Sequence, residues 1–165
     1  MKRALFTGIL AVLFTAGMMA QAKPDFSGTW TLDPEKSVMP QGRGAGMGGG
    51  RAGGMGGGPI TITVEGQKMS ISRTMGQSGN TVTTVYMLDG TASKNTMAGR
   101  GGAEPVEVVY TSKWNGAKLV TTIANPRGTS TETRWIEADG TMVVETTRTN
   151  PQGEAVTSKQ VYKKN

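Results

Sequence analysis

The chain has 165 residues, with 18 Lys and Arg against 12 Asp and Glu, a formal charge of +6, and neither His nor Cys. The absence of Cys excludes a disulfide framework, a thiolate nucleophile and a Cys-ligated metal, and the absence of His excludes a Ser-His-Asp triad and an imidazole metal site. The remaining composition fits one small globular domain with an excess of glycine, 25 residues in all.

Residues 1–22 have the pattern of a secretory signal peptide. Lys2 and Arg3 precede an apolar run that ends in an Ala-x-Ala cleavage pattern at positions 20–22. The run is short for a membrane span of about 20 residues, which favours cleavage over a membrane anchor. A chain without Cys has no site for a lipoprotein anchor. We therefore expect residues 23–165 to be the mature domain, periplasmic or secreted in a bacterium and not stably inserted in a membrane.

A Gly/Met-rich segment at residues 40–59 follows the first predicted strand. Positions 42–58 contain 11 glycines, ten of them in two consecutive octads that begin at Arg43 and Arg51. Such a segment has too few apolar side chains to offset its ordering entropy, so it is predicted to be a disordered loop. The two arginines have no interleaved aromatic residues, which argues against nucleic-acid binding.

Three methionines in and beside this segment recur eight positions apart, at Met39, Met47 and Met55. Thioethers are soft ligands that suit Cu(I). No His or Cys accompanies them, and binding would have to order the glycine segment. No metal site is predicted.

The rest of the chain alternates apolar and polar residues with a period of two, which is typical of β-strands. Strands are predicted at residues 26–32, 60–65, 68–72, 82–88, 106–110, 119–123, 131–136, 142–148 and 156–162. Asn-Gly and Asp-Gly pairs between several of these runs are strong hairpin signals. A sheet of this many strands has to remove its exposed edges, and the connections between the strands are short. Together these features favour an all-β fold, an up-and-down antiparallel barrel of about eight to ten strands.

The first strand carries the motif Phe-Ser-Gly28-Thr-Trp30, which resembles the G-x-W opening of the lipocalin and fatty-acid-binding protein group (the calycins). Arg134, the Asp-Gly turn at 139–140 and the ending Val-Tyr-Lys-Lys at 161–164 follow the order of the last strands of fatty-acid-binding proteins. The mature chain as a whole resembles small exported bacterial lipocalin-like proteins of unassigned function.

The resemblance implies a ligand-binding barrel, with Arg134 matching the family's internal arginine. The family's carboxylate clamp, R-x-Y on the last strand, corresponds here to Gln160 and Tyr162, so half of the clamp is missing. The Gly/Met-rich segment stands where fatty-acid-binding proteins have a helical lid, so no ordered helical lid is expected.

The candidate ligand-binding residues are Arg134, Tyr162, Tyr110, Tyr86 and Gln160. The tyrosines either belong to the core or orient the polar head of a ligand with their hydroxyls. An inward Arg134 needs an anionic partner, either a ligand carboxylate or Glu132 on the same face of its strand, and Glu132 is favoured.

The predicted barrel floor consists of Gly28, Trp30 and Arg148. Trp30 is expected to plug one end of the barrel, with Arg134 or Arg148 covering its ring in a cation–π contact.

No pair of carboxylates is placed by a motif for general acid–base work, because most lie in turns or on the water-facing side of strands. The chain is predicted to be a non-enzymatic binding protein without cofactor, holding a small hydrophobic or amphipathic ligand in the barrel. The alternative is a structural or interaction domain of the cell envelope, with a filled barrel and a protein partner. The two hypotheses differ in how completely side chains fill the interior.

Overall fold

The computed structural model describes residues 22–38, 58–75, 79–97, 103–126, 128–149 and 153–165. Within them the chain forms ten β-strands, β1 (Gly28–Leu32), β2 (Ile60–Glu65), β3 (Lys68–Met75), β4 (Asn80–Met87), β5 (Ala92–Met97), β6 (Val106–Asn115), β7 (Lys118–Asn125), β8 (Gly128–Ile136), β9 (Met142–Thr149) and β10 (Ala155–Lys164). This part of the chain contains no helix long and apolar enough to cross a membrane.

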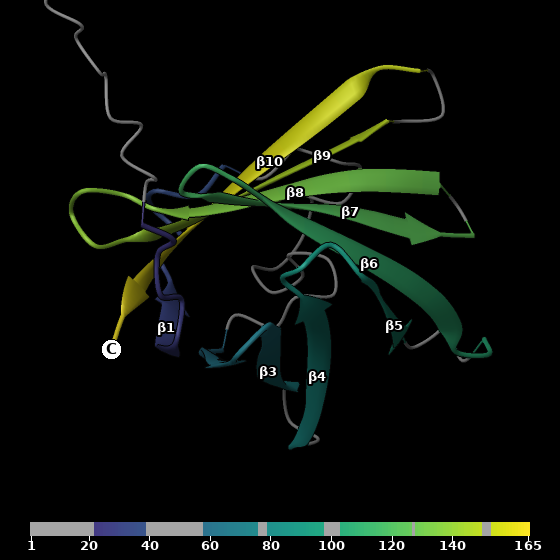
Figure 1. Cartoon of the computed structure of the whole chain (residues 1–165), viewed down its shortest axis with the longest axis horizontal. Coiled ribbons are helices and arrows are strands. Elements are labelled where there is room, and N and C mark those ends of the chain that lie inside the picture. The colour runs from purple at the N-terminus through teal and green to yellow at the C-terminus, as the bar shows by residue number, and fades with distance from the viewer. Residues whose placement is uncertain (1–21, 39–57, 76–78, 98–102, 127, 150–152) are drawn as a thin grey trace, which may run out of the picture.

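The strands form one antiparallel sheet in the order β4-β3-β2-β1-β10-β9-β8-β7-β6-β5. Every pair except β1–β10 joins strands that are consecutive in the sequence, and that pair brings the first strand beside the last. Figure 1 shows the sheet rolled over, with β3 and β4 below β7 and β8 in this view and running crosswise to them. The predicted all-β up-and-down barrel is thereby confirmed, with ten strands.

Each of the nine predicted strands overlaps one observed strand, and β5 is the strand that the sequence pattern did not reveal. Its two buried residues, Ser93 and Asn95, are polar, so β5 lacks the apolar alternation that marks the other strands. Most of the predicted Gly/Met-rich loop, residues 40–57, lies outside the described residues.

β4 and β5 flank the seam of the barrel, where polar side chains replace the backbone ladder. The Val85 N–H donates to Asn95 Oδ1 at 2.8 Å, and Asn95 Nδ2 donates to the Val85 carbonyl at 2.8 Å. Ser93 Oγ donates to the same carbonyl at 2.6 Å. The Asn95 amide thus takes the place of a backbone partner, and its donor and its acceptor are both used.

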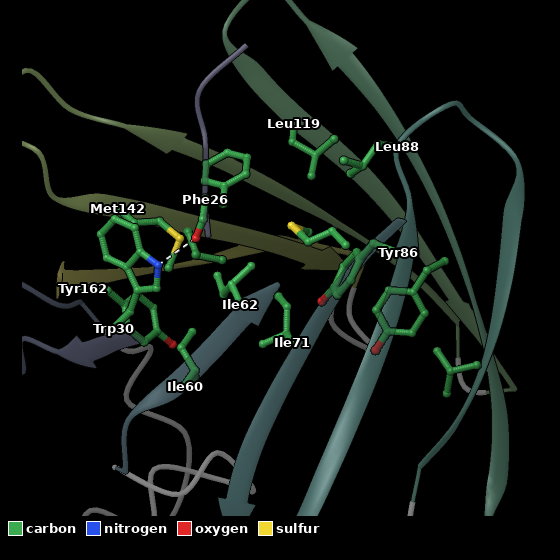
Figure 2. Close-up of a cluster of buried hydrophobic side chains, with 14 residues drawn as sticks. Phe26, Trp30, Ile60, Ile62, Ile71, Tyr86, Leu88, Leu119, Met142 and Tyr162 are labelled. Atoms are coloured by element: carbon green, nitrogen blue, oxygen red, sulfur yellow. Dashed lines mark hydrogen bonds between the residues drawn. The ribbon is translucent and has the colours of Figure 1, made fainter. Parts of the chain in front are cut away.

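Large buried side chains gather toward the closed end of the barrel, the end with the turns that follow β2, β4, β6 and β8. Trp30 and Phe26 are each 1% exposed, and Trp30 Nε1 donates to the Phe26 carbonyl at 2.8 Å (Figure 2). Phe26 stacks on Trp114, with the ring centroids 5.9 Å apart. Met69 and Met142 are fully buried and fill the adjoining space. Large aromatic and thioether side chains therefore fill much of this end of the barrel.

The outer face explains the abundance of threonine. A row of threonines in register crosses five neighbouring strands, β6 to β10, at Thr111, Thr122, Thr131, Thr147 and Thr157. The Thr147 and Thr157 hydroxyls are hydrogen bonded at 2.9 Å. Branched side chains with a hydroxyl suit a pleated surface that faces water, and cross-strand pairs of this kind stabilise the sheet.

The seam yields a first prediction. Asn95→Ala removes both side-chain bonds to Val85 and leaves a part-buried backbone N–H without its partner, at an expected cost of about 1–3 kcal/mol in the free energy of unfolding. Urea unfolding measures this loss, and hydrogen exchange should accelerate at the Val85 amide. Thr96→Ala, at the exposed neighbouring position on β5, serves as the control. Equal losses for the two variants would contradict a seam held by Asn95.

Candidate ligand-binding site

A buried ion pair lies in the interior of the barrel. Arg134 Nη2 donates to Glu132 Oε1 at 2.8 Å, and the two residues are only 4% and 7% exposed. They stand two positions apart on β8, so both side chains lie on its inner face. The predicted structural partner of Arg134, Glu132, is confirmed. The guanidinium is not fully hydrogen bonded, because Arg134 Nε is buried without a hydrogen-bond partner.

The predicted ligand-binding residues gather around this pair. The Arg134 guanidinium lies over the Tyr86 ring at 5.6 Å, and the ring of Tyr86 meets that of Tyr110 edge-on at 5.0 Å. The Tyr162 hydroxyl donates to Gln160 Oε1 at 3.3 Å. In the view of Figure 2, Tyr162 and Tyr86 lie on opposite sides of Ile62 and Ile71. The structure thus brings together residues from β4, β6, β8 and β10.

Burial keeps the tyrosines protonated. Burial, and then the nearby charge of Glu132, raise the pKa of Tyr86 well above its ordinary value and raise that of Tyr110 in the same way. Burial also raises the pKa of Tyr162, although Arg73 and Arg134 oppose the shift. All three hydroxyls are therefore neutral near pH 7 and able to donate a hydrogen bond.

Arg73 on β3 belongs to the same cluster, and the sequence analysis missed it. It is half-buried, its Nε is buried without a hydrogen-bond partner, and its charge acts on both Tyr162 and Tyr86. A signal was present in the sequence, because Arg73 continues the period-two series of Met69 and Ile71. We call the group Arg73, Tyr86, Tyr110, Glu132, Arg134, Gln160 and Tyr162 the interior polar cluster.

The floor of the barrel differs from the prediction in its cation. Trp30 is buried as expected, but Lys164 lies over its ring, with Nζ 5.4 Å from the centroid. Arg134 lies over the Tyr86 ring instead. Arg148 is exposed, and its register partner on β10 is Val156, whereas the register partner of Trp30 on β10 is Lys164. Arg148 is therefore not part of the floor.

Gly28 explains how Lys164 reaches Trp30. A Cβ at this position would lie 2.7 Å from Lys164 Cε, and the backbone has a φ of 125° that other residues rarely adopt. The glycine of the G-x-W motif therefore leaves room for the lysine side chain that covers the tryptophan.

The opposite end of the barrel, which we call the mouth, exposes apolar side chains of the inner face. Val82 shares its face of β4 with Tyr86, Met97 shares its face of β5 with Asn95, and Val106 shares its face of β6 with Val108. The three are 45%, 51% and 37% exposed, while Tyr86 and Val108 are buried. Solvent thus reaches apolar groups on the inner face at the mouth.

A separate hollow of about 230 Å³ lies at the closed end of the barrel. Its lining includes Lys23, Phe26, Gln67, Leu88 and Trp114, and none of the residues of the interior polar cluster. It is therefore distinct from the predicted ligand site, whose assignment rests on the cluster's own contacts.

The fold, but not the sequence, matches known proteins. No protein-family model matches the chain, and no curated protein matches it by sequence. A solved structure titled "REP1-NXSQ fatty acid transporter" aligns at a TM-score of 0.51 and 14% identity, covering 84% of this chain and 95% of that one. A secretory abundant heat soluble protein from Ramazzottius varieornatus aligns at 0.52 and 15%, covering 88% and 99%. The chain therefore has the fold of a calycin-like barrel.

The ion pair gives a second prediction. Glu132→Leu leaves the Arg134 charge buried without a partner and should cost about 3–5 kcal/mol in the free energy of unfolding, whereas the double variant Glu132→Leu/Arg134→Met should recover much of that loss. Urea unfolding of the two single variants and the double variant measures the coupling. In the control, Glu107→Leu breaks the exposed Lys94–Glu107 pair of 3.2 Å and should cost at most about 1 kcal/mol. Strictly additive losses at 132 and 134 would contradict the buried pair.

The tyrosines give a third prediction. Because folding raises their pKa, the stability that they contribute is present below the ordinary tyrosine pKa of about 10 and is lost as the pH rises above it. The three tyrosines are the only ones in the chain, so phenolate absorbance reports on them alone. We expect phenolate to appear together with unfolding in an alkaline titration. Full ionisation at the ordinary pKa in a still-folded protein would refute their burial.

Proposed function

We propose that the protein binds a small hydrophobic or amphipathic molecule in its barrel, with the polar end of the ligand at the interior polar cluster. The observation that carries the proposal is the division of the inner face, with solvent-exposed Val82, Met97 and Val106 at the mouth and a cluster rich in hydrogen-bond donors deeper inside. Binding sites of this kind combine apolar walls with a few convergent polar groups.

A completely filled barrel, the alternative from the sequence, fits these observations less well. A filled barrel interior buries its inward apolar residues against one another, whereas Met97 is 51% exposed. A solved fatty acid transporter has the same fold, but at 14% identity the similarity between the two structures supports the architecture only. The binding proposal therefore stands on the residues of the site.

We further propose that the ligand is bound without chemical change and without a cofactor. Of the twelve Asp and Glu residues, all of which fall within the described part of the chain, only Glu132 is buried inside the barrel. Its carboxylate is held by Arg134, which leaves it a poor general base. The raised pKa of each interior tyrosine likewise makes the phenol a poor acid near pH 7.

Export from a bacterial cytoplasm belongs to the same proposal. The charged start, the apolar run and the Ala-x-Ala pattern of residues 1–22 support it, and Ala22 and Lys23 are exposed in the folded domain. Cleavage after Ala22 would leave Phe26 and Trp30 in place to close the barrel. The mature domain would then act in the periplasm or outside the cell.

The full chain, expressed with its own residues 1–22 and purified without delipidation, tests the proposal by native mass spectrometry. We expect co-purified ligand, and we expect the emptied protein to bind the uncharged fluorophore Nile red. Val82→Asp places a charge on the inner face at the mouth and should weaken Nile red binding about five-fold or more.

Thr81→Asp is the matched control, because it adds the same charge one position away on the exposed outer face of β4. It should leave Nile red binding unchanged. A protein that co-purifies empty and ignores Nile red would favour the filled barrel with a protein partner, and equal effects of the two variants would place the probe outside the barrel.

A further inference from the structure

The hollow at the closed end of the barrel, with a volume of about 230 Å³, plays no part in the proposed function. Much of its lining is apolar, from the buried side chains of Phe26 and Leu88 and the half-buried ones of Val64 and Trp114. Its exposed polar side chains are those of Lys23, Asp25 and Gln67. Apolar walls with a few polar groups are what a site for a small ligand offers.

A cation of the chain itself lies on an aromatic ring of this hollow. Lys23 Nζ is 5.4 Å from the centroid of the Trp114 ring, and Phe26 stacks on the same ring at 5.9 Å. An ammonium group within about 6 Å of a ring centroid is attracted by the negative face of the ring, and Trp is the best aromatic partner. Within the described part of the chain Lys23 forms no ion pair, so its exposed ammonium group can exchange between the ring and water.

One carboxylate accompanies the ring. Asp25 lines the same hollow, and the Ser27 N–H donates to Asp25 Oδ1 at 2.8 Å. This backbone hydrogen bond is the main reason why the pKa of Asp25 is lowered, so the carboxylate is charged near pH 7. None of the ion pairs among the described residues includes Asp25. A negative charge beside an aromatic face suits a cation.

The lining favours an organic cation over a metal ion. The described residues hold no group of three or more His, Cys, Asp or Glu that could bind a metal. Val64 and Leu88 present aliphatic groups, on which the alkyl substituents of an ammonium ion can pack, whereas a bare metal ion gains nothing from them. A ligand cation that takes the place of the Lys23 ammonium also leaves the charge of the hollow unchanged.

We propose that this hollow is a second binding site, which takes a small alkylated ammonium ion by displacing Lys23 from the Trp114 ring. The nitrogen of the ligand lies over the indole, its alkyl groups contact Val64 and Leu88, and Asp25 neutralises its charge. The inference goes beyond the proposed function, because no residue of the interior polar cluster lines the hollow.

Three probes of similar shape and different charge test this site on the chain purified after export. They are choline, its uncharged carbon analogue neohexyl alcohol, and the tert-butylacetate anion. Each is titrated at constant ionic strength, while two-dimensional NMR follows the indole N–H signals of the three tryptophans. We expect choline to shift the Trp114 signal saturably and far more than those of Trp30 and Trp135. Choline should bind about five-fold or more tightly than neohexyl alcohol.

Two variants test the charged groups of the hollow. Lys23→Ala vacates the ring and should tighten choline binding about three-fold or more, which the loss of a merely structural residue would not do. Asp25→Asn keeps the oxygen that accepts the Ser27 N–H but removes the charge. It should weaken choline binding about five-fold and leave the binding of neohexyl alcohol unchanged.

The ring is tested against a second tryptophan. Trp114→Leu should weaken choline binding about ten-fold, and Trp114→Phe, which keeps an aromatic face, should retain part of the preference for choline over the alcohol. Trp135→Leu is the matched control, because Trp135 carries Lys118 at 4.2 Å from its centroid but does not line the hollow. It should leave choline binding unchanged. Thermal unfolding of each variant checks that the barrel remains folded.

The contrary outcomes are specific. Tighter binding of neohexyl alcohol or of the anion than of choline, no saturable shift with choline, or choline affinity that survives Trp114→Leu overturns the site. Choline binding that Lys23→Ala leaves unchanged or weakens overturns the displacement. None of these results touches the Nile red test, so the failure of this site and the failure of the proposed function are distinguishable.

Discussion

The interior of the barrel is organised around the hydrogen bond of 2.8 Å between Arg134 and Glu132. Two charges are removed from water there, which is tolerable only because they neutralise each other at close range. Their position two residues apart on β8 means that one strand fixes both groups. The field of Glu132 also helps to keep Tyr86 and Tyr110 protonated, so the pair shapes the chemistry of its neighbours. The polar character of the interior polar cluster depends on this local arrangement.

Side-chain contacts also complete the barrel at its seam and at its closed end. Asn95 and Ser93 provide at the seam what a backbone ladder provides elsewhere, and Lys164 crosses Gly28 to cover Trp30 at the closed end. Each device depends on a residue type that is unusual in a strand or is costly to bury. How the barrel closes therefore depends on these positions more than on the regular alternation of the outer face.

The period-two alternation allowed the barrel and nine of its strands to be predicted, because apolar inward residues reveal a strand directly. It failed at β5, whose inward residues are polar because they serve the seam. The inward direction of Arg134 and its pairing with Glu132 were predictable, since alternation and charge act within one strand. The approach of Lys164 to Trp30 and of Arg73 to Tyr162 depends on the pairing of β1 with β10 and on how the sheet is rolled, which local patterns do not encode. Arg148 was misplaced for that reason.

The half-buried charge of Arg73 runs against the stability of the barrel. A barrel selected only for stability would replace Arg73 with an apolar residue, because its series on β3 is otherwise Met69 and Ile71 and its Nε lacks a partner. Such a barrel would also cover the inward apolar residues at its mouth, whereas Val82 and Met97 are exposed to solvent here. Locally unfavourable features of this kind concentrate at functional sites, where a partner completes them. Under the proposed binding function, a small amphipathic ligand would satisfy both features at once, because its apolar part covers the mouth and its polar part reaches the guanidinium.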